Sequence, residues 1–410
     1  MRIIFRVVGG FFGLILLTVV GLSVAYYSIR EPFPKELDRS DSGPQFDPAL
    51  PAKTVAAVVA RLQMLRRDVG YPAVSVAVAL DGRIVFSHAL GTADIAGSKA
   101  VSTQTVFAIG SVSKPLTAAV AMRLSDMGLL DLDADIRRYV ATFPDKGVKI
   151  TARQLMSHQA GLRHYKFAPN MTLSEFGSTT NYSSVNSSLA VFKDDPLLFR
   201  PDEGFSYSSY GFVLLSAVLE GAAGKPFLSV MQDQLFTPIG MTRSGPDVFA
   251  KPPPGRAQDY MQVFKDGYVI QAPDVDSSGK WAGGGFASTP EDLVRFGAAL
   301  LEGHIVTRAS RDVMFTPRTT RDGKINPQQY GLGFRIDEVT DDVNPQRKAI
   351  VVHHGGVAVG TQSMLVLLPK AGVVVAICGN LRVDAYPLFD PATDIAFEIA
   401  GDRIVGSPSP

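Results

Sequence analysis

Residues 107–115 carry the pattern that decides the interpretation, and they read Phe107-Ala108-Ile109-Gly110-Ser111-Val112-Ser113-Lys114-Pro115. Ser111 and Lys114 are three positions apart at the start of a predicted helix, so the amine can reach the hydroxyl on one helical face. The N–H groups of a helix N-terminus favour negative charge on a serine alkoxide or on the oxyanion of acyl transfer. Apolar flanks indicate burial, which would lower the pKa of the lysine and make it a base. Taken alone, Ser-x-x-Lys is a weak signal that also fits a capped helix with a surface lysine.

Outward from this stretch, helical patterns fill the middle of the chain and strand patterns fill both ends. Apolar periodicity predicts helices at 54–69, 116–127, 153–157, 213–220, 293–301 and 392–400, with Thr289 as the N-cap of the fifth. Alternating or continuous apolar runs predict strands at 73–80, 83–90, 330–338, 349–354, 363–368 and 373–379. The polar segment 164–190 is predicted to be a long loop that shapes the substrate entrance. We therefore expect an α+β fold (an α/β sandwich). Its antiparallel sheet, built from both chain ends, is flanked by helices and carries an inserted, mainly helical lobe at roughly 115–300.

The N-terminal segment has a different character. The stretch Val7–Tyr27 is uncharged and nearly all apolar, and Arg2 and Arg6 precede it. This length just spans a bilayer, and the basic residues would stay cytoplasmic. The sequence predicts an inner-membrane anchor at 1–29, a polar linker at 30–51 and a hydrolase domain at 52–402 on the periplasmic side. Small residues at 23–25 leave open a cleaved signal peptide and a secreted protein.

Composition excludes several classes of site. The chain has 410 residues, a formal net charge of +1 and no basic stripe, which argues against a nucleic-acid partner. Its one cysteine, Cys378, lies in an apolar run and is expected to be an inert core residue. No His, Cys or carboxylate spacing indicates a metal site.

Two further motifs carry polar side chains, and each is weak alone. Tyr207 in Tyr207-Ser208-Ser209 precedes an apolar helix and could shuttle protons, or it could be a packing aromatic. The run His353-His354-Gly355-Gly356-Val357 ends a predicted strand; glycines allow close backbone approach, and the N–H that follows them can bind an oxyanion. His158 is expected to be a structural hydrogen-bonding residue.

The order of these motifs resembles the serine β-lactamase and penicillin-binding-protein family, and the closest branch is that of class C β-lactamases with their esterase and peptidase relatives. Supporting motifs stand at 155–162, 238–242 and 284–293. The stretches 184–189 and 192–197 are similar to the mitochondrial serine β-lactamase-like protease and its bacterial relatives.

The resemblance implies that no metal or organic cofactor is needed, and it implies a role for each site residue. Ser111 would attack a carbonyl, Lys114 and Tyr207 would share the proton transfers, and the N–H groups of Ser111 and Val357 would form the oxyanion hole. Ser209 replaces the family's asparagine, and His354 replaces its lysine, so both, with Gly356, would contact substrate. A neutral histidine is a poor anchor for the carboxylate of a β-lactam.

Three functions stay open from the sequence. The first is a serine hydrolase acting on a peptide, amide or ester outside the cytoplasm. The second is a β-lactamase or a D-Ala-D-Ala carboxypeptidase. The third is a catalytically silent envelope scaffold, against which the retention of Ser111, Lys114 and Tyr207 argues. The oligomeric state is not predicted.

Overall fold

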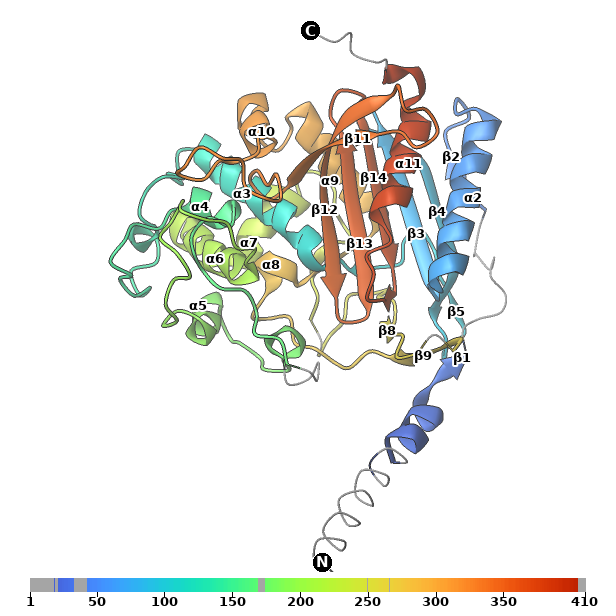
Figure 1. Cartoon of the computed structure of the whole chain (residues 1–410), viewed down its shortest axis with the longest axis horizontal. Helices are drawn as coiled ribbons and strands as arrows, with labels where there is room; N and C mark the ends of the chain where they lie inside the picture. Colours follow the sequence, from blue (N-terminus) through green and yellow to red (C-terminus); the bar gives the residue numbers. More distant parts are fainter. Residues whose placement is uncertain are drawn as a thin grey trace, which may run out of the picture.

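The computed structural model describes residues 18, 21–32, 43–168, 174–248, 250–264 and 266–404. Its centre is an antiparallel sheet built from both ends of the chain (Figure 1). In spatial order the strands are β11 (Arg335–Thr340), β12 (Lys348–Ala358), β13 (Thr361–Leu368), β14 (Val373–Gly379), β3 (Ala73–Leu80), β4 (Arg83–Asp94) and β2 (Gln45–Phe46), with β5 (Lys99–Ala100) paired to β4. The predicted α+β fold is confirmed.

Both faces of the central strands are buried, which is why they read as continuous apolar runs. On β3, Val74, Val76 and Val78 pack against α2 (Ala52–Val69) and α11 (Phe389–Ala400). The alternate residues Ala77 and Ala79 face the opposite core, where α9 (Pro290–Glu302) crosses β3 and β14. Small side chains on that face let the helix lie close to the sheet.

The remaining helices form the lobe beside the sheet. They are α3 (Ser113–Asp126), α4 (Ala152–Met156), α5 (Val185–Ser188), α6 (Ser209–Ala223), α7 (Phe227–Met231), α8 (Trp281–Gly284) and α10 (Arg308–Met314). Short 3-10 helices lie at η1 (Gly110–Val112), η2 (Ile136–Arg138), η4 (Glu175–Gly177), η5 (Leu189–Val191) and η7 (Gly401–Arg403), and η6 (Gln232–Phe236) is a π-helix. The predicted loop at 164–190 thus contains η4, α5 and part of η5.

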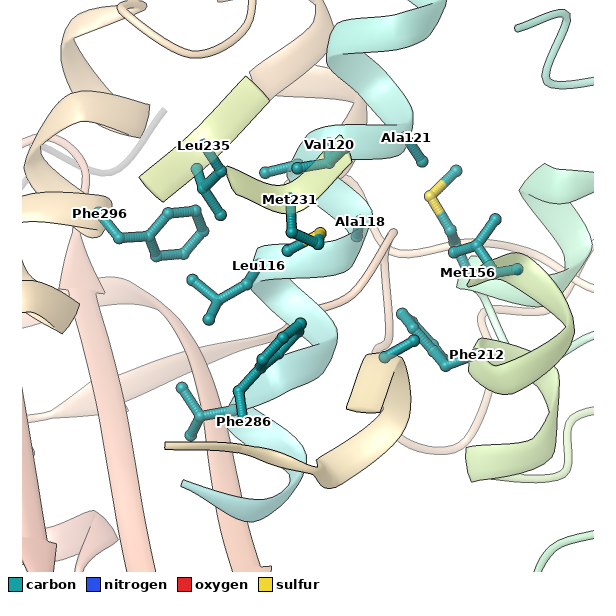
Figure 2. Close-up of a cluster of buried hydrophobic side chains, with 14 of the residues drawn as sticks. Leu116, Ala118, Val120, Ala121, Met156, Phe212, Met231, Leu235, Phe286 and Phe296 are labelled. Carbon is teal, nitrogen blue, oxygen red and sulfur yellow. The ribbon is translucent and has the colours of Figure 1, made fainter. Parts of the chain in front are cut away.

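Helix α3 is the axis of the lobe. In Figure 2, Leu116 of α3 lies beside Phe286 and Phe296, while Met156 and Phe212 lie on the other side of the helix. Nearly every residue of α3 is buried. A helix enclosed on all sides cannot shift without opening cavities, so the groups at its N-terminus are held rigidly.

Two small sheets complete the fold. One joins β6 (Phe107–Ala108), β10 (Phe286–Ser288) and β7 (Gly245–Pro246), and it leads directly into η1. The other joins β1 (Glu31–Pro32), β9 (Tyr268–Gln271), β8 (Tyr260–Met261) and β15 (Leu381–Arg382).

Three predicted strand boundaries were wrong, and the first is that of the strand predicted at 83–90, which continues to Asp94. The strand predicted at 330–338 begins only at Arg335, because Gly333 turns the chain with φ +85° against α3, where a Cβ would lie 2.6 Å from Ala118. The strand predicted to end at His354 continues to Ala358, because its last residues pair with β13. Gly356 and Val357 are therefore strand residues, not loop residues.

The predicted membrane anchor at 1–29 lies mostly outside the described residues. Residues 21–29 are helical and lead into β1. Among the residues that the structure describes, no single helix is long and apolar enough to cross a bilayer. One bent pair of helices, Ser209–Ala223 with Phe227–Phe236, meets that test jointly.

Candidate active site

Ser111 lies on η1, at the point where strand β6 turns into helix α3. The turn depends on Gly110, which has φ +48° and approaches β12 so closely that a Cβ would lie 2.6 Å from the backbone of Val357. Ser113 secures it, since its hydroxyl donates to Gly110 O at 2.7 Å and accepts from Phe286 N–H at 3.2 Å. The predicted nucleophile is thus fixed next to the edge of the sheet.

Lys114 is fully buried beneath Ser111. Its Nζ lies 3.0 Å from Ser111 Oγ and 2.9 Å from Ser209 Oγ, and it contacts the carbonyl of Gly283. Burial lowers the pKa of Lys114 well below its ordinary value, and the charge of Arg335 lowers it further. A neutral amine has two N–H groups, which fit Ser209 and Gly283, and one lone pair, which fits the Ser111 hydroxyl. The geometry is that of a base and its nucleophile.

Tyr207 is half-buried in the cavity wall, and its hydroxyl makes a hydrogen bond with Ser111. Its ring lies 4.8 Å from Lys114 Nζ. Burial raises the pKa of Tyr207 above its ordinary value, although Arg335 and Ser111 act against that shift. The side chain is therefore a phenol at neutral pH and can donate a proton. The predicted hydroxyl, amine and phenol converge.

His158 holds the loop that carries Tyr207, as expected of a structural residue. Its Nδ1 accepts the N–H of Ser208 at 3.1 Å, and its carbonyl accepts the N–H of Ser206. Burial lowers the pKa of His158 well below its ordinary value, which keeps Nδ1 an acceptor. The tight turn at this histidine has φ +60°.

The structure places His354 beside Tyr207 but outside the cavity lining. The two ring centroids are 6.3 Å apart, and His354 is fully buried. Its Nδ1 lies 2.7 Å from Gly355 O, so that nitrogen carries the hydrogen and Nε2 accepts from Tyr330 OH at 2.9 Å. Burial lowers the pKa of His354 well below its ordinary value. The side chain is a neutral link to Tyr330 and presents no cation to a substrate.

The edge of β12 carries the N–H of Val357, which the sequence predicts as the second oxyanion donor. Gly356 N–H donates to Tyr386 OH at 3.1 Å, and Tyr386 OH in turn donates to the carbonyl of Ser363 on β13, so the N–H of Gly356 faces β13. Neighbouring N–H groups of a strand point to opposite edges, so that of Val357 points toward η1 and Ser111. Pairing with β11 ends at His353, which leaves this edge uncovered by β11. Gly356 has to be glycine, since a Cβ would lie 2.0 Å from Ile109 O.

A cavity of about 500 Å³ opens above Ser111. Of the predicted residues, Tyr207, Ser209 and Val357 also line it. The others come from residues 164–167, from η4, from strands β11, β12, β13 and β15, and from residues 386–389, where the chain enters α11; they are His164, Tyr165, Phe167, Phe176, Arg335, His353, Gly355, Met364, Arg382, Tyr386 and Phe389. The wall is largely aromatic with two cations, Arg335 and Arg382.

Sequence reasoning missed Arg335 and His353. Arg335 begins β11 and pairs with His353 of β12, which brings it over the ring of Tyr207 at 5.5 Å from the centroid. His353 Nε2 bonds Asp337 Oδ2 at 2.7 Å. No local motif marks Arg335, since only the strand pairing brings it to the site. In the described part of the chain, no group of three or more His, Cys, Asp or Glu side chains could hold a metal.

Comparison with known proteins agrees with this geometry. The sequence profile of the Beta-lactamase family matches residues 53–395. The mitochondrial serine beta-lactamase-like protein LACTB of Mus musculus is 29% identical over 83% of this chain and 79% of its own length. Penicillin-binding protein 4* of Bacillus subtilis (strain 168) is 28% identical over 69% of this chain and 62% of its own length.

Solved structures share the fold. The octameric penicillin-binding protein homologue from Pyrococcus abyssi superposes with a TM-score of 0.69 at 22% identity, covering 86% of this chain and 79% of that protein. At this identity the likeness concerns the fold alone. The family match covers most of the chain, and the predicted resemblance is confirmed: the chain belongs to the beta-lactamase family of serine hydrolases.

Proposed function

We propose that this enzyme hydrolyses a peptide, amide or ester bond through an acyl-enzyme on Ser111, outside the cytoplasm. The observation that carries the proposal is the buried amine of Lys114 within 3.0 Å of Ser111 Oγ. A silent scaffold has no need of a desolvated lysine, whose burial is costly without a function.

The reaction follows from the contacts. Ser111 Oγ attacks the substrate carbonyl while its proton passes to Lys114 Nζ, and the oxyanion is bound by the N–H groups of Ser111 and Val357. Tyr207 OH gives its proton to the leaving nitrogen or oxygen as the carbon–heteroatom bond breaks. The phenolate then regains a proton from the Lys114 ammonium. Water enters, attacks the ester carbonyl and releases the acid, again with Lys114 and Tyr207 moving the protons.

The cavity favours a substrate with apolar groups and a carboxylate. The wall formed by Tyr165, Phe167 and Phe176 suits an apolar side chain, and Arg335 offers a cation where His354 does not. The relatives include Penicillin-binding protein 4* and a D-aminopeptidase of Gluconobacter oxydans (strain 621H), whose names fit peptide substrates. A small peptide is therefore the substrate class we propose, with the enzyme tethered to the inner membrane through its N-terminal segment.

A second candidate, β-lactam hydrolysis or D-Ala-D-Ala carboxypeptidase activity, is favoured by one observation. Position 354 has a histidine where many relatives have the lysine that binds a substrate carboxylate. Arg335 lines the cavity and can bind that carboxylate instead. Turnover of nitrocefin and of D-Ala-D-Ala peptides, measured beside L-peptides and short-chain esters, separates these candidates.

Labelling with a fluorophosphonate tests the core of the proposal. The intact protein should gain one adduct, located on Ser111 by peptide mass mapping, and Ser111→Ala should gain none. Ser183→Ala, a change at an exposed serine of the lobe, is the matched control and should label at the wild-type rate. An unlabelled wild-type protein that hydrolyses no member of the panel would support the scaffold instead.

A further inference from the structure

The first described helix does not leave the domain on a free linker. Residues 21–29 are helical, and the chain then forms β1, which pairs antiparallel with β9 at Glu31↔Val269 and Pro32↔Tyr268. Figure 1 shows this helix leaving the domain where β1 lies beside β9. Strands β8 and β9 form a hairpin, so the helix ends against a defined piece of structure, the β8–β9 hairpin.

Side chains clamp the end of the helix to the turn of this hairpin. Tyr26 OH donates to Asp266 Oδ2 at 2.8 Å, and its ring packs edge-on against Phe264 with centroids 5.0 Å apart. The Arg30 guanidinium lies 3.7 Å from the centroid of the Tyr268 ring and 3.6 Å from Asp266 Oδ2. Helix and hairpin therefore keep one relative orientation.

The surface around this clamp exposes large apolar side chains. On the hairpin turn, Val263 and Phe264 are 47% and 57% exposed. On the helix, Val24, Tyr27 and Ile29 are about as exposed as Phe264. Aromatic rings and an arginine next to aliphatic side chains are the mixture that settles at the interface between lipid headgroups and hydrocarbon.

The sequence before the helix indicates that this exposed surface contacts a lipid bilayer. It is uncharged from Val7 up to the helix and nearly all apolar, so the exposed patch continues a segment with the composition of a bilayer anchor. A water-facing helix end would not need apolar groups on the neighbouring hairpin as well.

We propose that the turn of the β8–β9 hairpin is a second membrane contact, in which Val263 and Phe264 enter the lipid interface beside the N-terminal helix. The contact would fix the orientation of the catalytic cavity relative to the membrane. Strand β8 pairs with β15, and Arg382 of β15 lines that cavity. The cavity wall is thus connected, through β15 and β8, to the contact between the N-terminal helix and the hairpin. This inference does not depend on the hydrolase activity.

A fluorescent reporter on the full chain tests the contact. Cys378 is the sole cysteine and is buried, so an environment-sensitive fluorophore can be attached selectively at Phe264→Cys. Val343→Cys is the matched control, since Val343 is 82% exposed in the turn between β11 and β12, far from the hairpin in Figure 1. Both proteins are reconstituted in vesicles of equal parts phosphatidylcholine and phosphatidylglycerol, with and without spin-labelled lipid.

The fluorophore at position 264 should brighten several-fold in vesicles and be quenched by spin-labelled lipid, while that at position 343 should respond to neither. Equal responses at the two positions, or a full chain that does not float with the vesicles, would overturn the proposal. The melting temperature of each variant, compared with that of the wild type, checks that both proteins are folded. Fluorophosphonate labelling of Ser111 is measured separately, so failure of the hydrolase proposal and failure of the membrane contact are distinguishable.

Discussion

The two walls of the catalytic cleft differ in how their residues reach the site. The lobe wall carries Ser111, Lys114 and Tyr207, which stand in short motifs at helix starts and touch one another through hydrogen bonds and ring contacts. The sheet wall carries Arg335, which stands in no motif and is placed there by its pairing with His353 of β12. The comparison indicates that local sequence encodes the groups that we propose to transfer protons, while strand register places the cation that we propose to anchor a substrate.

The largest effect is expected on the lobe wall, from Lys114→Ala. Loss of a positioned general base lowers rates by about 10²–10⁴-fold. The rate constant for fluorophosphonate labelling should fall by this amount while the melting temperature stays at or above the wild-type value, because a buried amine is removed. Lys146→Ala, a change distant from Ser111, serves as control. Equal labelling rates for Lys114→Ala and wild type would refute the assignment of the base.

A smaller effect is expected on the sheet wall, from Arg335→Gln. A hydrogen bond to a charged group contributes roughly 1.5–3 kcal/mol, so KM for a substrate with a free carboxylate should rise about tenfold or more. The same substrate with its carboxylate amidated should be affected much less. Equal changes for both substrates would show that Arg335 does not bind the carboxylate.

The same variant should also shift the pH profile. Arg335 lowers the pKa of Lys114, so its removal raises that pKa. Because Lys114 must be neutral to act as a base, activity is lost as the pH falls through its pKa. The acidic limb of the kcat/KM profile should therefore move to higher pH in Arg335→Gln. An unchanged acidic limb would mean that the charge of Arg335 does not alter the pKa of Lys114.

The smallest effect concerns stability in acid. His158 of the lobe wall and His354 of the sheet wall are buried and have pKa values well below the ordinary value. Below about pH 6.5 the unfolded chain binds protons that the folded protein does not, so stability falls by up to about 1.4 kcal/mol per pH unit for each histidine. Urea unfolding at several pH values measures this slope. His354→Gln should flatten it below pH 6.5, and parallel slopes for variant and wild type would contradict the assignment.

Much of the fold could be predicted from local sequence patterns. The buried strands β3, β13 and β14 and the helix α9 with its Thr289 cap appeared close to their predicted bounds, because apolar period and capping chemistry are local properties. Strand β11 was predicted too early, since the turn at Gly333 is imposed by contact with Ala118. Contact with a distant helix leaves no local signal.

The sequence by itself determined that Ser111 and Lys114, the proposed nucleophile and base, lie together and that the glycines approach neighbouring backbone closely, because i, i+3 spacing and the absence of a Cβ act over a few residues. Tertiary structure alone decided that His354 would be buried behind the cavity against Tyr330 and that Arg335 would be one of the two cations lining the cavity above Ser111. The physical reason is that alternation along β12 and its register with β11 assign each side chain to a face, and register depends on the packing of the whole sheet.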